Sequence, residues 1–417
     1  MLRKGRLHRD EQFSNALDLG YIELQNWLMN YAERMSRLGT ETAFEVLAAA
    51  KALEAEGRPI IHLEIGEPDF DTPANIVEAG IRALRDGWHH YTPAVGIKEL
   101  REVIAEEIFR TRGIEVDPDE VVVTPGAKPI IFFCLQALAG PGDEVVYPNP
   151  GFPIYESVIS FVGAKPIPIA LKEELDFRMD MSDLIGAISD RTRMIILNSP
   201  NNPTGSVLTK EDLGLLAGAC RDRDLVILSD EVYNRMIYQG EHFSIASFPD
   251  MKRKTIILDG FSKTYAMTGW RLGYGVMESS LAEQIGKLMI NSNSCTAAFT
   301  QIAGIEAIRG DQAESEKMIA TFRDRRDRVV ELLNRIEKVS CRSPKGAFYV
   351  FPNVKELGRP ALEIQRALLQ EANVALLSGT AFGAYGEGYL RLSYAASLEQ
   401  LEEGIERIRT VLERSLD

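Results

Sequence analysis

The chain has 417 residues, of which 45% are hydrophobic and 26% are charged. This balance is ordinary for globular proteins and excludes a collagen-like, coiled-coil or largely disordered chain. At roughly 150 residues per domain, the length predicts two or three domains with a sizeable buried core. The net charge of −14 repels polyanions, so nucleic acid and anionic membrane surfaces are poor partners.

Neither a disulfide framework nor a membrane span is indicated. The four cysteines stand far apart and form no C-x-x-C pair, which fits a reducing cytoplasm. The longest strongly apolar stretch, Pro129 to Gly140, has 12 residues, fewer than the ~20 that span a bilayer. The basic start of the chain lacks the apolar segment and cleavage site of a signal peptide. We therefore expect a cytoplasmic protein.

The first ~35 residues carry an apolar face at helical spacing. Its members are Phe13, Leu17, Leu24, Trp27, Leu28 and Tyr31. We expect residues 1–35 to form a separate helical extension.

From Glu120 onward, short β-rich runs alternate with longer amphipathic ones. This alternation predicts strands and helices around a mostly parallel sheet. The predicted strands are Val121–Thr124, Glu144–Tyr147, Pro166–Ala170, Met194–Asn198, Leu225–Ser229, Thr255–Asp259 and Leu272–Val276. Ligands of such sheets bind at the carboxyl ends of the strands, so candidate site residues are sought there.

The segment Asp311 to Lys338 combines many Arg and Glu residues with apolar positions at helical spacing. This pattern predicts one long solvent-facing helix that links two bodies. Beyond it we expect a smaller α+β unit, with a strand, a helix, a strand and a helix over Gly346–Pro352, Ala361–Ala372, Tyr389–Tyr394 and Leu398–Leu412.

Several enzyme classes find little support in the sequence. There is no G-x-S-x-G elbow and no G-x-x-x-x-G-K-[ST] loop. The five histidines never fall at the i, i+4 spacing of a helical metal site, so no metal is expected. Gly273-Tyr274-Gly275 lacks the third glycine of a nicotinamide-binding turn.

The most informative stretch runs from Asp259 to Gly273, where Lys263 follows a predicted strand. Ser262 precedes this lysine, and Arg271 lies eight positions further on. The hydroxyl and the guanidinium could hold one anion while the amine forms a Schiff base with a carbonyl group. A lysine at the end of a strand is more often an exposed turn residue, but these neighbours favour a chemical role.

This stretch resembles the lysine motif of class I/II aminotransferases, which are pyridoxal-phosphate enzymes of fold type I. Further segments follow in the order of that family: Gly66–Pro73, Tyr91–Gly96, Gly126–Lys128, Asn149–Tyr155, Asn198–Gly205, Ser229–Tyr233 and Arg391–Tyr394. The resemblance covers about Leu38 to Leu412. It implies an α/β fold with a large domain, whose mostly parallel central sheet is flanked by helices, and a smaller α+β domain.

The resemblance also divides the chain. Residues 66–310 would form the large domain that binds the cofactor. Residues 36–65 would form the N-terminal part of the small domain, and residues 311–417 would supply the interdomain helix and the rest of the small domain.

Pyridoxal 5'-phosphate is the cofactor that the resemblance implies. Lys263 would carry it as a Schiff base and act as general acid and base. Asp230 would face the pyridine nitrogen, because a neighbouring negative charge favours its protonated form. Asn202 and Tyr233 would bond the phenolic oxygen, and Phe152 would stack on the ring.

The phosphate of the cofactor needs fixed donors. The resemblance supplies four: the backbone N–H groups of Ala127 and Lys128 at a predicted helix N-terminus, the Ser262 hydroxyl and the Arg271 guanidinium. Gly260 stands where the family often has serine, which removes one expected hydroxyl contact. Tyr91 matches a tyrosine that reaches the phosphate of the neighbouring subunit, which implies a homodimer with shared sites.

Arg391 resembles the arginine that grips the substrate α-carboxylate through two parallel hydrogen bonds, with Asn202 as a further substrate contact. The side-chain specificity stays open. The partner-subunit arginine of one aspartate-specific branch has no match in Gly286 to Thr296. In a bacterial branch with the same G-x-K turn, the position of Lys128 helps to bind acidic side chains.

The expected function is transfer of an amino group from an L-amino acid, aspartate or a similar one, to a 2-oxo acid by a ping-pong mechanism. A C–S β-lyase or a cyclopropane-carboxylate synthase would use the same cofactor residues. A non-catalytic sensor that keeps the cofactor as a ligand is a third alternative. Such sensors usually carry a DNA-binding domain, whereas only ~35 residues precede the family region here.

Overall fold

In the computed structural model, residues 29–414 are described, and they belong to two units that divide between Leu38 and Gly39. The described part of the first unit contains a 3-10 turn, η1 (Glu33–Arg37), with exposed residues. The predicted apolar face lies outside the described residues except for Tyr31, which is exposed. The helical extension predicted over residues 1–35 thus stays a prediction.

In the second unit, seven strands form a sheet in the order β2-β8-β7-β6-β5-β3-β4. They are β2 (Val121–Thr124), β3 (Glu144–Asn149), β4 (Lys165–Ala170), β5 (Thr192–Asn198), β6 (Val226–Asp230), β7 (Thr255–Gly260) and β8 (Gly273–Val276). All the predicted strands are therefore present, with ends that shift by one or two residues. Strand β8 runs antiparallel to both of its neighbours, β2 and β7, and every other pair in this sheet is parallel, which confirms the prediction of a mostly parallel α/β sheet.

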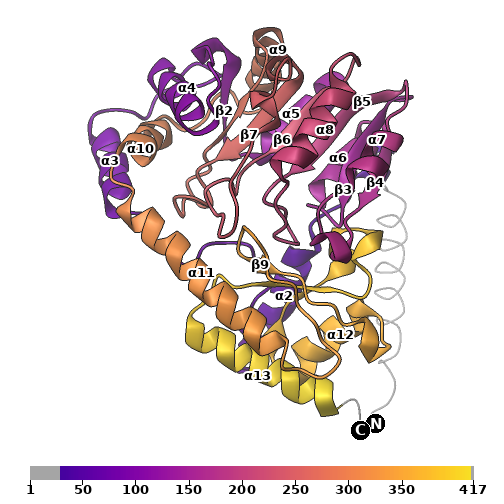
Figure 1. Ribbon diagram of the computed structural model, residues 1–417. Coiled ribbons are helices and arrows are strands. Elements are labelled where there is room, and N and C mark those ends of the chain that lie inside the picture. Colours follow the sequence, from indigo (N-terminus) through magenta and orange to yellow (C-terminus); the bar gives the residue numbers. More distant parts are fainter. Residues whose placement is uncertain (1–28, 415–417) are drawn as a thin grey trace, which may run out of the picture. The chain divides into compact units, whose positions relative to one another are not determined.

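Helices cover both faces of the sheet (Figure 1). They are α3 (Ala74–Arg85), α4 (Lys98–Arg112), α5 (Lys128–Leu138), α6 (Ile154–Phe161), α7 (Met181–Gly186), α8 (Lys210–Cys220), α9 (Ser279–Ile290) and α10 (Ala298–Arg309). Alternate residues of β5 enter different cores. Met194 and Ile196 pack with α5, α6 and α9, whereas Ile195 and Leu197 pack with α7 and α8. This alternation explains why the strands appear in the sequence as continuous apolar runs.

A smaller body is built from about the last quarter of the chain and the segment before the sheet. Its helical elements are α2 (Thr42–Ala55), α12 (Ala361–Ala367), η7 (Leu368–Ala372) and α13 (Leu398–Arg414). Strands β11 (Leu377–Ser378), β12 (Leu390–Ser393) and β9 (Tyr349–Val350) form one sheet, and β1 (Ile61–His62) pairs with β10 (Val374–Ala375). The predicted strand, helix, strand and helix occur here in that order. The domain boundaries themselves stay a prediction.

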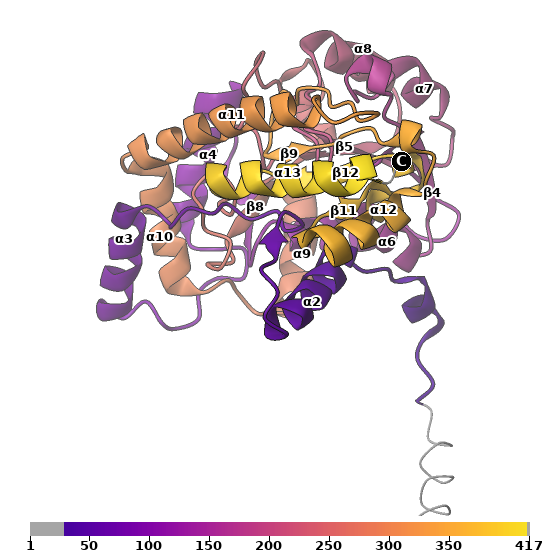
Figure 2. The same cartoon turned by 90° about the horizontal axis from the view of Figure 1, so that it is seen from below.

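The long charged helix differs from its prediction. It is α11 (Ala313–Leu333), shorter at both ends than Asp311 to Lys338. After Leu333 the chain turns, and the Asn334 side chain accepts a hydrogen bond from the backbone N–H of Cys341 at 2.9 Å. One face of α11 is buried in the core that it shares with α13, so the helix is solvent-facing on one side only. Figures 1 and 2 show α11 and α13 side by side.

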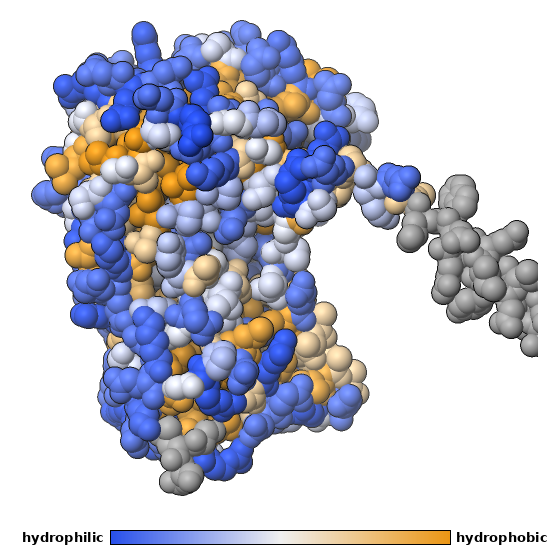
Figure 3. All heavy atoms as spheres, turned by 90° about the vertical axis from the view of Figure 1, so that its right-hand side faces the viewer, coloured by the Kyte–Doolittle hydropathy of each residue, from blue (hydrophilic) through white to orange (hydrophobic). Residues whose placement is uncertain are grey.

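The face of the molecule in Figure 3 is mostly hydrophilic, with smaller hydrophobic areas between the polar side chains. Within residues 29–414, no helix is both long enough and apolar enough to cross a membrane.

The turn between β2 and α5 packs directly on the backbone of β8. Thr124 at the end of β2 pairs with Gly273. A Cβ atom on Gly273 would lie 2.3 Å from the backbone nitrogen of Ala127, so only glycine allows this approach. The contact fixes where α5 begins, and with it the N-terminus of that helix.

Gly273→Ala should therefore destabilise the protein, because the added methyl group meets backbone atoms that cannot move aside. We expect a loss of about 1–3 kcal/mol in the free energy of unfolding, measured with urea. The control is Gly218→Ala in α8, where a Cβ atom meets nothing within 4 Å. That variant should be neutral or gain up to about 1 kcal/mol. Equal losses in both variants would contradict the packing argument.

Candidate active site

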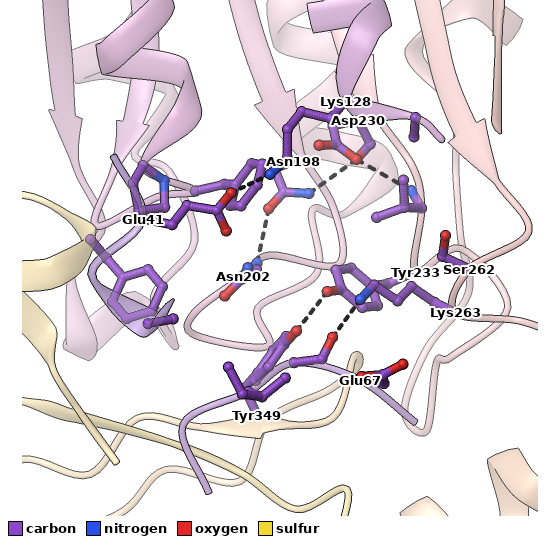
Figure 4. Close-up of a pocket in the computed structure, with 18 of the residues that line it drawn as sticks. Glu41, Glu67, Lys128, Asn198, Asn202, Asp230, Tyr233, Ser262, Lys263 and Tyr349 are labelled. Atoms are coloured by element: carbon purple, nitrogen blue, oxygen red, sulfur yellow. Dashed lines mark hydrogen bonds and ion pairs between the residues drawn. The ribbon is translucent and has the colours of Figure 1, made fainter. Parts of the chain in front are cut away.

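A cavity of about 480 Å³ lies at the carboxyl ends of the central strands, between the sheet and the smaller body. Ten residues named from the sequence line it: Ala127, Lys128, Phe152, Asn202, Asp230, Tyr233, Ser262, Lys263, Arg271 and Arg391. Tyr91 does not line it, and this residue is 89% exposed. Figure 4 shows Asp230 on one side and Tyr349 and Glu67 on the other, with Lys263 between them.

Lys263 stands in the loop that follows β7. Its amine donates a hydrogen bond to the backbone carbonyl of Gly66 (Figure 4). Burial lowers the pKa of Lys263 to about 8; the positive charge of Arg391 acts in the same direction, against the negative charge of Glu67. An amine with this pKa is partly unprotonated near neutral pH, so it can attack a carbonyl carbon and exchange protons.

Asp230 is the last residue of β6 and is buried. The Tyr155 hydroxyl donates to its Oδ2 at 2.5 Å, and the backbone N–H of Val232 lies 3.4 Å from Oδ1. Burial raises the pKa of Asp230 to about 7, although the bond from Tyr155 acts in the opposite direction. A cationic group placed in the cavity beside this carboxylate would favour its ionised form.

The N-terminus of α5 forms an anion-binding corner. Gly126 has φ of +87°, and a Cβ atom there would lie 2.1 Å from Arg271 Nη2, so this turn requires glycine. The guanidinium is held by a 2.7 Å bond from Arg271 Nη1 to the Thr268 carbonyl. The positive end of the α5 dipole, this guanidinium and the Ser262 hydroxyl at the same cavity suit a phosphate group.

Gly260 has a packing reason for differing from the serine common in the family. A Cβ atom at this position would lie 3.3 Å from Gly273 Cα and 3.4 Å from Ala127 Cβ. The end of β7 is thus packed closely against β8 and the anion-binding turn, at the cost of the extra hydroxyl.

Arg391 projects from β12 and is only 3% exposed. Its Nη1 lies 3.4 Å from Asn202 Oδ1, and its Nη2 donates to the Glu64 carbonyl. The guanidinium carbon lies 4.6 Å from the centroid of the Tyr349 ring and 4.9 Å from that of Phe382. Neither of its described hydrogen bonds goes to a carboxylate, so Arg391 retains the capacity to bind one.

Asn202 and Tyr233 form part of the same wall. The Asn202 backbone N–H donates to Asn198 Oδ1 at 2.8 Å, and Asn198 Nδ2 lies 3.2 Å from the Asp230 carbonyl. The Tyr233 and Tyr349 hydroxyls are 2.8 Å apart. These bonds fix the Asn202 backbone and the Tyr233 side chain at the cavity, while the roles of both residues toward a ligand stay predictions.

Lys128 forms an ion pair with Glu41, the residue before α2 (Figure 4). The Lys128 amine also lies 5.4 Å from the centroid of the Phe152 ring. Glu41, Tyr155 and Tyr349 are site residues that the sequence analysis did not name. Tyr155 belongs to the Asn149–Tyr155 motif and could have been found there, whereas Glu41 lies outside every motif.

These groups fit pyridoxal phosphate. The anion-binding corner suits its phosphate, the Lys263 amine suits its aldehyde, and the buried Asp230 carboxylate suits a protonated ring nitrogen. Arg391 remains for the carboxylate of an amino acid. The cavity can therefore hold the cofactor and its substrate together.

Comparisons with known proteins agree with this arrangement. Residues 58–408 match the model of the family described as aminotransferase class I and II. The aspartate aminotransferase of Pyrococcus horikoshii is 42% identical over 385 residues, which cover 92% of this chain and 97% of that protein. The aromatic-amino-acid aminotransferase 2 of Thermococcus litoralis is 38% identical over 388 residues, covering 92% and 98%.

The solved structure of the aspartate aminotransferase from Rhizobium meliloti matches with a TM-score of 0.89 and 34% identity, covering 93% of this chain and 100% of that one. The sequence match, the fold and the cavity thus lead to one conclusion. The chain belongs to the class I and II aminotransferases and is a pyridoxal-phosphate-dependent transaminase of fold type I.

Proposed function

We propose that this aminotransferase takes its amino group from aspartate or a similar acidic L-amino acid and passes it to a 2-oxo acid in a ping-pong reaction. One observation carries the choice of donor. Besides Lys263 and Arg271, the cavity is lined by two cationic side chains, Arg391 and Lys128. They provide one partner for each carboxylate of a dicarboxylic amino acid.

The residues of the chain divide the chemistry between them. Bound pyridoxal phosphate supplies an electron sink for the carbanion formed at the substrate Cα. Lys263 Nζ accepts the proton from Cα as general base, which its lowered pKa favours. Asp230 holds negative charge beside the ring nitrogen. Arg391 orients the substrate α-carboxylate, and approach of the smaller body excludes water from the cavity.

The remaining site residues bind the cofactor in this proposal. Asn202 and Tyr233 donate to its phenolic oxygen, and Phe152 stacks on its ring. The phosphate is held by Ser262, Arg271 and the backbone N–H groups of Ala127 and Lys128.

We place Tyr91 at the phosphate of a partner subunit in a homodimer. Its high exposure and its position outside the cavity of its own chain support this placement. We also assign the enzyme to the cytoplasm. The four free cysteines, three of them buried, are compatible with a reducing compartment.

Glu41 competes with the distal carboxylate of the substrate for Lys128, and the outcome affects which donor the enzyme prefers. Lys128 is paired with Glu41, so the distal carboxylate of aspartate has to take the place of the Glu41 carboxylate. If the pair stays closed, the cavity offers the apolar rings of Phe44, Phe152 and Phe382 instead. These rings favour aromatic amino acids as a second candidate donor class, which the Thermococcus litoralis relative also supports.

Lys263→Ala should lower turnover by about 10⁴-fold or more, because it removes both the covalent partner of the cofactor and the proton carrier. The cofactor should no longer become fixed to the chain by borohydride reduction. Lys317→Ala, at an exposed position of α11, is the control and should behave as the unmodified enzyme. Normal transamination by Lys263→Ala would overturn the role of this lysine.

Asp230→Asn should change the pH dependence of stability in the cofactor-free protein. The pKa of Asp230 is about 7 in the folded protein, against an ordinary value of 3.8 for the side chain. Because the folded state binds this proton more tightly, stability falls as pH rises from about 4 through 7. The asparagine variant lacks this loss, so urea unfolding at pH 8 should find it more stable by a few kcal/mol, on the order of 1.4 kcal/mol per pKa unit.

Adding the cofactor should reverse that order, because Asp230 then has a cationic partner. If the variant binds pyridoxal phosphate as tightly as the unmodified protein does, and turns over at the same rate, Asp230 is not the partner of the ring nitrogen.

Lys128→Met should lower kcat/KM for aspartate about 10- to 100-fold, the effect of losing one charge-assisted hydrogen bond. Phenylalanine should be affected little, because methionine preserves the contact with Phe152. Glu41→Gln should raise kcat/KM for aspartate severalfold, since it removes the competing carboxylate. Steady-state kinetics with both donors measure this. An unchanged aspartate value in Lys128→Met, with phenylalanine as the better donor, would favour the aromatic alternative.

A further inference from the structure

A row of titratable side chains leads from the surface of the smaller body to the residue that holds Arg391. Lys51 lies 2.7 Å from Glu54 on α2, and Glu54 Oε1 lies 3.1 Å from His62 Nε2. His62 Nδ1 lies 2.7 Å from Glu64 Oε1. Side-chain exposure falls along this row, from 63% at Lys51 to 28% at His62 and 0% at Glu64. A proton from solvent can therefore reach His62, whereas Glu64 is sealed in the interior.

Glu64 and Arg391 each keep one buried polar atom without a hydrogen-bond partner. These atoms are Glu64 Oε2 and Arg391 Nε. The two residues are already joined, because Arg391 donates to the Glu64 backbone carbonyl. Burial lowers the pKa of Arg391, and the negative charge of Glu64 is among the influences that oppose this shift. Buried polar atoms normally have partners, so each of these two atoms has the capacity for one further hydrogen bond.

We propose that Glu64 is a positioning residue for Arg391, with its backbone carbonyl holding the guanidinium and its buried carboxylate opposing the approach of a substrate carboxylate, and that the charge on His62 sets the strength of this opposition. The inference rests on the role proposed above for Arg391.

The charge on His62 determines the sign of the effect. When His62 is protonated, its charge balances that of Glu64, and an arriving carboxylate meets little opposing field. When His62 is neutral, the negative charge of Glu64 acts on the substrate carboxylate and on Arg391. Substrate carboxylates should therefore bind more weakly as His62 loses its proton.

The groups that face His62 determine the pH at which it loses its proton. They are Glu54 from α2, with Lys51 behind it, and Glu64 in the chain segment that follows β1; Arg391 from β12 lies beyond Glu64. Burial alone would lower the pKa of His62, but the bonds and charges of Glu64 and Glu54 outweigh it and raise this pKa above its ordinary value. Affinity should fall as pH rises through this raised pKa.

The test uses the holoenzyme and maleate, a dicarboxylate that cannot donate an amino group. The dissociation constant is measured from the absorbance change of the bound cofactor between about pH 6 and 9, in the unmodified enzyme and in His62→Asn. Titration of the lysine bound to cofactor affects both proteins, so the ratio of the constant of the unmodified enzyme to that of His62→Asn isolates the contribution of His62. We expect this ratio to rise about three- to tenfold with pH, as for a coupling of half to one pKa unit.

Two further variants separate this role from a merely structural one. The ratio should approach one at high pH, and Glu64→Gln should bind maleate more tightly than the unmodified enzyme at both ends of the pH range, because the opposing carboxylate is absent. Glu54→Gln removes one partner of His62, so the transition should move to lower pH with its two limits unchanged. A ratio that does not depend on pH, or a midpoint that Glu54→Gln leaves in place, would overturn the proposal.

The variant Arg391→Lys distinguishes a failure of the role proposed for Arg391 from a failure of the role proposed for Glu64. Weak maleate binding by this variant at every pH supports the role of Arg391, so a flat ratio in the His62→Asn experiment would then count against the Glu64 proposal alone. If Arg391→Lys binds maleate as the unmodified enzyme does, the role of Arg391 is wrong and the inference fails with it.

Discussion

Three carboxylates are buried at the carboxyl ends of two neighbouring parallel strands, and the site depends on how their charges are balanced. Arg112, the last residue of α4, binds two of them: its Nε lies 3.0 Å from Glu231 and its Nη2 lies 2.6 Å from Asp259. Asp230 receives only neutral donors, chiefly the Tyr155 hydroxyl. The uncompensated charge is thus concentrated on the residue that faces the cavity, and a protonated pyridine ring would be the cation that balances it.

The site also depends on the backbone segment between the smaller body and the sheet. In this segment the Gly66 carbonyl accepts a hydrogen bond from Lys263, and the Glu64 carbonyl accepts one from Arg391. Both cations are therefore held by neighbouring carbonyl groups. In the proposed reaction, binding of cofactor and substrate would exchange these neutral acceptors for an aldehyde carbon and a carboxylate. A preorganised site of this kind loses little side-chain entropy when the ligands arrive.

Much of this arrangement could be predicted from the sequence, because its signals are local. A sheet covered on both faces requires apolar runs, which located all seven strands of the main sheet, and the cofactor motifs are short segments that follow those strands.

What could not be predicted depends on pairs distant in sequence. The Glu41 to Lys128 pair and the approach of Glu64 to Arg391 join residues that share no motif. The end of α11 was misjudged because the bond between Asn334 and Cys341 overrides helical periodicity. The names of the relatives favour transamination over the lyase, synthase and sensor alternatives.

Amino transfer from an acidic donor is tested most directly by a half-reaction. The purified holoenzyme is mixed with aspartate in the absence of any acceptor, while cofactor absorbance and released products are followed together. We expect conversion of the bound cofactor from its aldehyde form to its amine form, with one equivalent of the 2-oxo acid of aspartate released per site. A cofactor that keeps its aldehyde form while the amino acid loses a β-substituent or ammonia, or does not react, would contradict it.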